Sequence, residues 1–393
     1  MNIAGPRTLA PRLVALLASG AGLSVAGLYY NQPILGAIDA DLGATPAEVG
    51  LVPMLTQLGY GAGILFFAPL GDRLDRRRVI LAKLIALGVA LCAAGLAPSI
   101  AWLAVASLAI GLLATAAQDY VPAAATLAPI AVRGRIIGTV MTGLLLGILL
   151  SRLVSGTVSD QLGWRAVFFG AAGSIAALAA VSAVGLPSFE PATKESYGSL
   201  LRSMAVLARD LAPLRRAALT QGLLSVAFSG FWSTLALALA APPYRLGSTA
   251  AGAFGLAGAA GALIAPLAGA IADKRGPVSV IRIGTCLVVG AFLLMALWQG
   301  SIAVLVIGAV VFDLGVQASL ISHQTIVYGL DPAARSRVNA VLVSVMFVGM
   351  SVGAALASNA LARYGWSGVT WLGVIAGGAA FGVRALPERR ASP

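Results

Sequence analysis

The chain has 393 residues, of which 59% are hydrophobic and only 10% are charged, and its mean hydropathy is +0.94. Soluble proteins carry about 25% charged residues, so this composition excludes a soluble enzyme, a coiled coil and a disordered chain. It indicates an all-α polytopic membrane protein, because each spanning helix needs about 20 apolar residues. The net charge of +12 would suggest nucleic acid as the partner of a soluble protein; here its distribution along the chain decides its meaning.

Twelve apolar runs, separated by charged or turn residues, predict twelve spanning helices. In chain order they cover residues 13–36, 47–70, 79–97, 101–128, 136–159, 165–186, 217–240, 249–272, 279–298, 301–328, 338–361 and 366–383. A polar stretch follows the sixth helix. The expected organisation is therefore an N-terminal six-helix bundle over residues 1–186, a cytoplasmic linker over 187–216 and a C-terminal six-helix bundle over 217–393.

The Lys and Arg residues are distributed unevenly between the two sides of this arrangement. Of the 26, 21 fall on the side that holds both termini, three fall on the other side, and two lie inside predicted helices. Loops rich in Lys and Arg stay in the cytoplasm. The charge therefore predicts a bacterial inner-membrane protein with both termini in the cytoplasm, in contact with the lipid bilayer, and no nucleic-acid partner.

Landmarks recur in the two halves at a constant distance along the chain. Gly163-Trp164 returns as Gly365-Trp366, at an offset of 202 residues, and Arg133-Gly134-Arg135 returns as Arg335-Ser336-Arg337 at the same offset. This spacing predicts a duplicated six-helix unit. Because each unit has an even number of spans, the two copies share one orientation and frame a central substrate path.

The loop between the second and third predicted helices carries a recognisable motif. It reads Asp72-Arg73-Leu74-Asp75-Arg76-Arg77-Arg78 and resembles the signature loop G-x-x-x-D-R/K-x-G-R/K-R/K of the major facilitator superfamily. The second copy, Gly269 to Gly276, keeps both family glycines, whereas Ala68 and Asp75 replace them in the first. With the helix count and the duplication, this resemblance implies the fold of that family, two parallel six-helix repeats.

In such a loop an aspartate can meet the positive N-terminus of a neighbouring helix, or an arginine, and latch the cytoplasmic ends of the two halves. The resemblance implies a latch made of Asp72, Arg73, Asp75, Arg76, Asp273, Lys274, Arg133 and Arg335. The alternative is that the arginines only fix topology and contact anionic lipid.

Charged residues inside the membrane are costly and therefore informative. Lys83 lies about one turn into its predicted helix and is expected to reach the cytoplasmic surface. Asp119, Arg152 and Asp313 lie deeper, about 13, 24 and 22 Å from that surface at about 1.5 Å per residue. Matching depths predict an ion pair between Arg152 and Asp313 that bridges the halves and breaks when they open.

The two deep carboxylates are also candidates for carrying a coupling proton, because a carboxylate with little access to water holds a proton near neutral pH. Asp119 is the first choice, since no cation is evident at its depth, and Asp313 is the second. The alternative for each is a permanent ion pair that only packs the helices.

Neutral polar residues lie at helical spacing on the first, fourth, seventh and tenth helices, which line the cavity in the family. The expected substrate cavity is lined by Tyr30, Asn31, Gln32, Thr115, Gln118, Gln221, Ser225, Trp232, Gln317 and Gln324. Polar stripes can instead hold helices together. His323 is expected to be a packing residue.

The fifth predicted helix carries Gly138, Gly143, Gly147 and Gly156, similar to the glycine motif of antiporters in the family, although Ile148 replaces the motif proline. With 29–33, the stretch 143–152 resembles a bacterial efflux-type subgroup. We therefore expect proton-coupled export of a small organic solute by antiport. The alternatives are uptake by symport or facilitated diffusion, and a non-transporting sensor or scaffold.

Other function classes find no support in the residues. The sequence has no phosphate-binding loop and no nucleophile–base pair, so no enzymatic role is expected. One histidine and two isolated cysteines provide no metal site. We expect no cofactor, a proton gradient as the source of energy, and a monomer.

Overall fold

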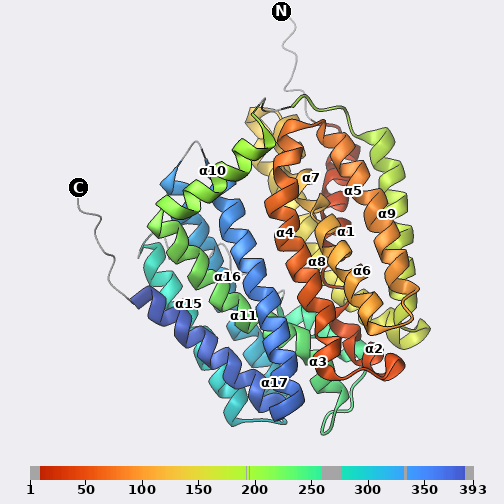
Figure 1. Ribbon diagram of the computed structural model, residues 1–393, viewed down its shortest axis with the longest axis vertical. Coiled ribbons are helices and arrows are strands. Elements are labelled where there is room, and N and C mark those ends of the chain that lie inside the picture. Colours follow the sequence, from red (N-terminus) through yellow and green to blue (C-terminus); the bar gives the residue numbers. More distant parts are fainter. Residues whose placement is uncertain are drawn as a thin grey trace, which may run out of the picture.

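The computed structural model describes residues 9–191, 193, 195–258, 274, 276–331 and 334–385, and its regular secondary structure there is entirely helical. The all-α prediction is confirmed. Figure 1 shows two groups of helices side by side, with one shorter helix, α10, lying across one end. We call that end, which also carries the α4–α5 loop and the start of α8, the arginine-rich end.

The N-terminal group comprises α1 (Pro11–Ala26), η1 (Gln32–Ile34), α2 (Leu35–Leu42), α3 (Pro46–Val49), α4 (Leu51–Arg73), α5 (Arg76–Gly95), α6 (Ile100–Ala114), α7 (Ala116–Leu127), η2 (Ile130–Val132), α8 (Arg133–Leu162) and α9 (Trp164–Gly185). The linker contains α10 (Tyr197–Asp210). The C-terminal group comprises α11 (Ala212–Ala240), α12 (Ser248–Ala253), α15 (Pro277–Leu297), α16 (Ile302–Leu330) and α17 (Arg335–Ala385).

Nine helices of the described ranges are long and apolar enough to span a membrane. The described residues give eleven spans when breaks are taken into account, because α17 holds two spans divided at Gly365 and the first span is α1 continued by η1. The span predicted at 249–272 lies largely outside the described residues, which include only its start up to 258.

The first span differs from its prediction as one helix over 13–36. Helix α1 ends at Ala26, and the chain passes through a turn before η1 begins at Gln32. Pro33 lies in η1, directly after this break, and proline cannot donate the backbone hydrogen bond that a continuing helix needs. The break lies in the membrane interior and turns the side chains of Tyr29 and Gln32 toward the C-terminal half, as their contacts described below show.

The duplication is visible in the backbone. Gly163 ends α8 with φ 86°, and Gly365 divides α17 with φ 62°, so both copies of the Gly-Trp pair use glycine in a conformation that L-residues rarely adopt. The crossings of spans are also repeated. The backbone at Gly22 of α1 approaches Gly147 of α8, and Gly222 of α11 approaches Gly349 of α17 in the same way. A Cβ at either Gly147 or Gly349 would lie 2.2 Å from the facing carbonyl oxygen.

The two halves touch mainly toward the end opposite the arginine-rich end. There α3 packs against α17, where Gly50 faces Ser358, and α8 packs against α12, where Gly156 faces Ser248. Near mid-membrane the ring of Tyr60 lies 4.6 Å from that of Phe347. These contacts place the residues at the centre of the interface in an enclosed environment.

Helix α10 was not predicted, because the linker was treated only as a polar stretch. Its apolar residues Leu201, Met204 and Leu207 lie on one face and pack on the ends of α11, α16 and α17. The hydroxyl of Tyr197 donates a hydrogen bond of 2.9 Å to the carbonyl of Phe66 on α4. Helix α10 therefore contacts both halves.

Candidate functional site

The centre of the interface contains a buried arginine. Arg152 extends from α8, ten residues before that helix ends at Leu162, and is only 4% exposed. Its Nε donates a hydrogen bond of 3.0 Å to Oε1 of Gln32. Its guanidinium lies between two rings, 4.9 Å from the centroid of Tyr29 and 4.3 Å from that of Trp232. Because Trp232 belongs to the C-terminal half, this stack joins the two halves.

Asp313 of α16 lies next to this stack and is 3% exposed. Its Oδ1 accepts a hydrogen bond of 3.3 Å from Nε1 of Trp232. The predicted direct ion pair with Arg152 is wrong for this conformation, since no ion pair within 4.0 Å joins the two side chains, both of which are described. The indole separates them: its face contacts the guanidinium while its N–H contacts the carboxylate.

The depth argument behind that prediction nevertheless holds. Arg152, Trp232 and Asp313 lie ten, eight and eleven residues from the ends of α8, α11 and α16 that are opposite the arginine-rich end. These separations correspond to about 12–16 Å at about 1.5 Å per residue. The three side chains therefore share one level of the membrane, and the indole occupies the position expected for the ion pair.

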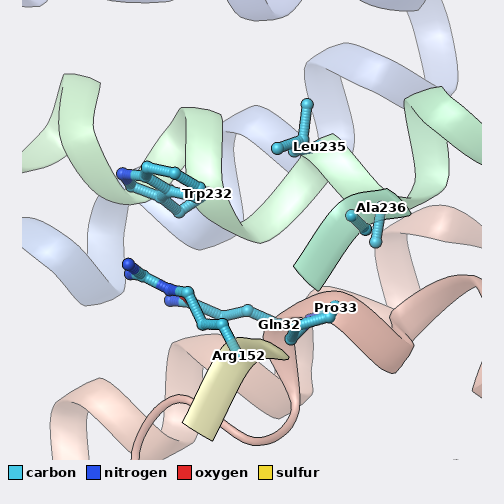
Figure 2. Close-up of a pocket in the computed structure, with 7 residues that line it drawn as sticks. Gln32, Pro33, Arg152, Trp232, Leu235 and Ala236 are labelled. Atoms are coloured by element: carbon cyan, nitrogen blue, oxygen red, sulfur yellow. The ribbon is translucent and has the colours of Figure 1, made fainter. Parts of the chain in front are cut away.

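A small pocket borders this cluster (Figure 2), with a volume of about 10 Å³, which is room for about one water molecule. Its lining consists of Gln32, Pro33, Arg152, Trp232, Leu235, Ala236 and Ala251. Two buried donors beside it, Nη2 of Arg152 and Nε2 of Gln32, have no hydrogen-bond partner. In Figure 2 both side chains come from the N-terminal half and face Trp232 across the pocket.

The second buried carboxylate, Asp119 on α7, has a different setting. Its Oδ2 accepts a hydrogen bond of 2.7 Å from Nζ of Lys83, and both side chains are at least 93% buried. The prediction that Lys83 reaches the surface is therefore wrong, as is the premise that Asp119 has no cation at its depth. Helix α5 begins at Arg76, three residues earlier than predicted, which places Lys83 two turns into the membrane, level with Asp119.

The other predicted cavity residues pair away from this cluster. Asn31 donates to the hydroxyl of Thr56, and Gln118 donates to that of Tyr60. Gln221 and His323 form a buried pair, with Oε1 of the amide 3.0 Å from Nδ1 of the imidazole. Of the predicted set, only Gln32 and Trp232 lie together with Arg152 and Asp313.

The remaining predicted cavity residues make local contacts. The hydroxyls of Thr115 and Ser225 donate to carbonyls of their own helices, and Gln324 donates to Asn339. Tyr30 and Gln317 are partly buried. Of the whole predicted set, Asn31, Gln118, Gln221 and Gln324 therefore make side-chain hydrogen bonds to a different helix in this conformation.

The predicted latch residues at the arginine-rich end stay within one half in this conformation. Asp72 pairs with Arg76 at 3.0 Å, four residues on. Asp75 caps its own helix α5 by accepting from the N–H of Arg77 and also accepts from the N–H of Phe189 in the linker. The remaining latch candidates divide as follows: Arg73, Arg133, Lys274 and Arg335 are exposed, and Asp273 lies outside the described residues. A latch between the halves at this end stays a prediction.

A contact of the kind predicted for Asp72, between an aspartate and the N-terminus of a helix in the other half, is present at the end opposite the arginine-rich end. Asp160, near the end of α8, accepts hydrogen bonds of 3.0 and 2.8 Å from the backbone N–H groups of Ser248 and Thr249. These groups open α12, so a carboxylate of the N-terminal half meets the positive end of a helix of the C-terminal half. Sequence reasoning missed Asp160 because it lies just beyond the end of the predicted span at 136–159, where a carboxylate is not unusual.

Sequence reasoning also missed Tyr29 and the role of Lys83. Tyr29 directly precedes Tyr30, Asn31 and Gln32, which were predicted to line the cavity. Only the break in the first span shows that the side chain of Tyr29 points toward Arg152. Across the described ranges, no three His, Cys, Asp or Glu side chains are grouped so as to hold a metal ion.

Comparison of the sequence with known proteins shows the family to which the chain belongs. The sequence profile of the Major Facilitator Superfamily matches residues 17–328. The chain belongs to the major facilitator superfamily. It is 39% identical over 368 residues to the uncharacterised transporter YgaY of Escherichia coli O157:H7, covering 93% of each chain. It is 34% identical over 369 residues to the probable transporter SCO4007 of Streptomyces coelicolor, covering 93% of this chain and 85% of that one.

The fold agrees with solved structures of this superfamily. A crystal structure of the nucleoside transporter NupG superposes with a TM-score of 0.76 at 15% identity, covering 95% of this chain and 97% of the other. The predicted major facilitator fold is thereby confirmed. The protein is a multi-pass membrane transporter, and the Arg152–Trp232–Asp313 cluster lies where its two repeats meet.

Proposed function

We propose that this transporter moves a small organic solute across the bacterial inner membrane by proton-coupled alternating access, and that Asp313 carries the proton. One observation supports this assignment above all. Asp313 is a deep carboxylate that forms no ion pair and contacts, through Trp232, a cation of the other half. When the halves rock apart, the distance from Arg152 to Asp313 changes, so the affinity of Asp313 for a proton changes with the conformation.

Asp119 is less suited to this role. Its partner Lys83 lies in the same half, so rocking of the two halves leaves the ion pair intact. Protonating Asp119 would strand a buried ammonium group, which is unfavourable in the membrane. We therefore assign Asp119 to the packing of α5 against α7.

The direction of coupling follows from the charge that the solute brings. A solute with a negative charge would bind beside Arg152 and offset its positive charge. The ionised form of Asp313 then loses the attraction of that charge, which favours protonation of Asp313. Solute and proton then bind together, and an inward proton gradient drives uptake by symport. The free donor of Arg152 favours this candidate. Export by antiport, the expectation from the glycines of α8, is the second candidate and requires that solute and proton exclude each other.

The experiment uses purified protein in liposomes, offered a panel of small organic acids, amides and amines, with uptake measured by mass spectrometry. An inward proton gradient is imposed in one set and an outward gradient in the other. We expect the inward gradient to accumulate at least one solute, and a protonophore to abolish the accumulation. Accumulation under the outward gradient alone would instead establish antiport.

Asp313→Asn is the matched variant, because it keeps the shape and removes the proton site. It should retain exchange of the solute without a gradient while losing gradient-driven accumulation. Accumulation that persists in Asp313→Asn would contradict its role as proton carrier. Binding of a solute without any flux would indicate a sensor and overturn transport itself.

A further inference from the structure

The pocket beside Arg152 presents hydrogen-bond donors without acceptors. Nη2 of Arg152 and Nε2 of Gln32 are both buried and unpartnered, in side chains that are 96% and 97% buried. Each lies two covalent bonds from an atom of the hydrogen bond that joins the two residues, so both free donors belong to one hydrogen-bonded pair of side chains. Leaving such donors unpaired is unfavourable by itself. Two such free donors, one of them charged, fit the two oxygens of a carboxylate.

The position of the donors suits a ligand that enters when the halves part. Gln32, Arg152 and Tyr29 all belong to the N-terminal half and hold one another through a hydrogen bond and a ring contact. Trp232 covers them from the other half. The pocket has room for about one water molecule, so a solute needs more space than this conformation offers. Withdrawal of Trp232 uncovers the guanidinium without breaking its contacts to Gln32 and Tyr29.

The other residues that line the pocket indicate the chemistry of the rest of the ligand. Pro33, Leu235, Ala236 and Ala251 contribute apolar surface, and the indole of Trp232 adds a flat ring. Arg152 supplies a single positive charge. We propose that Arg152 and Gln32 bind the carboxylate of a small organic monoanion whose apolar part faces the C-terminal half. This identification of the solute class rests on the proposed transport function.

Binding of the anion has a consequence for the proton. The charged and titratable groups that face Asp313 are Arg152 on α8 and Tyr29 in the break of the first span, while its hydrogen bond comes from the neutral Trp232. An ionised Asp313 and a bound carboxylate repel each other and compete for one guanidinium. The anion is therefore bound with a proton on Asp313, which makes the combined cargo neutral.

The experiment measures binding to the purified full-length protein by calorimetry, with benzoate and hexanoate as probes and benzamide and hexanamide as uncharged matches. We expect at least one carboxylate to bind at least tenfold more tightly than its amide. Arg152→Gln should weaken that binding at least tenfold, and Gln32→Glu should abolish it by neutralising the guanidinium. Repeating the titration in two buffers of different ionisation enthalpy should show about one proton taken up per anion in the wild type and none in Asp313→Asn.

Controls separate a lost site from a lost fold. Arg165→Gln removes an exposed arginine of α9 and should leave binding unchanged. Arg152→Lys keeps the charge and should restore part of the affinity. Equal binding of acid and amide, binding that survives Arg152→Gln, absence of carboxylate binding, or release of a proton on binding would overturn the proposal. Gradient-driven flux of a neutral or cationic solute through the same protein would overturn the anion site while leaving proton-coupled transport standing.

Discussion

The two buried carboxylates, Asp119 and Asp313, have similar exposure but opposite surroundings. Asp119 is paired at 2.7 Å with Lys83, a residue of its own half. Asp313 is held by the neutral Trp232, and the nearest cation lies across the interface between the repeats. The difference teaches that burial of a charge does not identify a functional group. Under the proposed mechanism the location of its partner decides, because only a partner in the other half changes its distance from the carboxylate during alternating access.

The C-terminal half offers a further contrast at the arginine-rich end. Lys83 and Asp119 lie seven and eight residues from the nearby ends of α5 and α7. His323 lies seven residues from the end of α16 and pairs with Gln221. At a similar depth, one repeat buries an ion pair and the other an amide–imidazole pair. The duplicated fold therefore accepts different chemistry at related levels, provided that the polar groups pair within one repeat.

The largest effect that we predict concerns the ion pair within one half. Lys83→Met leaves the Asp119 carboxylate buried without its partner and should lower the free energy of unfolding by about 3–5 kcal/mol. The double variant Lys83→Met/Asp119→Leu should recover most of that loss, because no charge is then stranded. Unfolding by denaturant in detergent micelles measures both variants.

Asp313→Asn is the matched comparison, because it removes a charge that has no ion-pair partner and keeps an acceptor for Trp232. Its unfolding free energy should change by less than about 1 kcal/mol. If Lys83→Met and Asp313→Asn destabilise the protein equally, the distinction between a structural and a functional carboxylate fails.

The second prediction concerns Asp160, whose carboxylate crosses between the halves at the opposite end. Asp160→Ala removes the cap of α12, which is worth about 0.5–2 kcal/mol, and should favour the conformation open at that end about two- to thirtyfold. Distances between spin labels at Gln161 and Arg245, with Cys92 and Cys286 replaced by Ser, measure the populations. An unchanged distance distribution would show that Asp160 does not latch this end.

The smallest effect is expected for the exposed pair of Asp41 and Arg165, which lies at the same end but within one half. Hydrogen bonds from Arg165 and Trp164 hold the pKa of Asp41 below its ordinary value of 3.8. With both side chains at least 40% exposed, solvent screening limits the contribution to less than about 1 kcal/mol. Because the folded-state pKa is depressed, this stability is present above pH 3.8 and is lost as the pH falls through the lower value.

Asp41→Asn should therefore reduce thermal stability slightly at pH 7, and the difference from the wild type should disappear in acid. It should leave the spin-label distances unchanged, which makes it the control for Asp160→Ala. A loss of stability as large as that of Lys83→Met would show that exposure does not weaken ion pairs in this protein.

Much of the fold was accessible from the sequence because membranes constrain it. Apolar runs predicted the spans, and the Gly-Trp pairs at offset 202 predicted the duplication. The structure adds that the glycines of both pairs have positive φ. Helical rise placed Arg152 and Asp313 at one level. The positions of the Tyr29 and Trp232 rings beside Arg152 were not predictable. The first depends on the break at 27–31, which turns Tyr29 toward the guanidinium, and the second depends on the rotamer of Trp232.

Two other errors had local signals. The start of α5 was placed three residues late because Arg76, Arg77 and Arg78 were treated as loop, although Asp75 before them is a good N-cap. That shift moved Lys83 toward the surface and hid its pairing with Asp119. Helix α10 had a spacing of apolar residues at 201, 204 and 207 that is typical of an amphipathic helix.

The glycine crossings have a consequence for biogenesis. The contact of Gly22 with Gly147 is complete once α8 has been synthesised, and it uses no residue of the second repeat. The contact of Gly222 with Gly349 likewise uses no residue of the first. Each repeat thus contains both helices of its own glycine crossing, so the N-terminal half can pack in the bilayer while the ribosome is still translating the rest. Chains split in the segment between α9 and α10 should reassemble into a working transporter when the two parts are produced together.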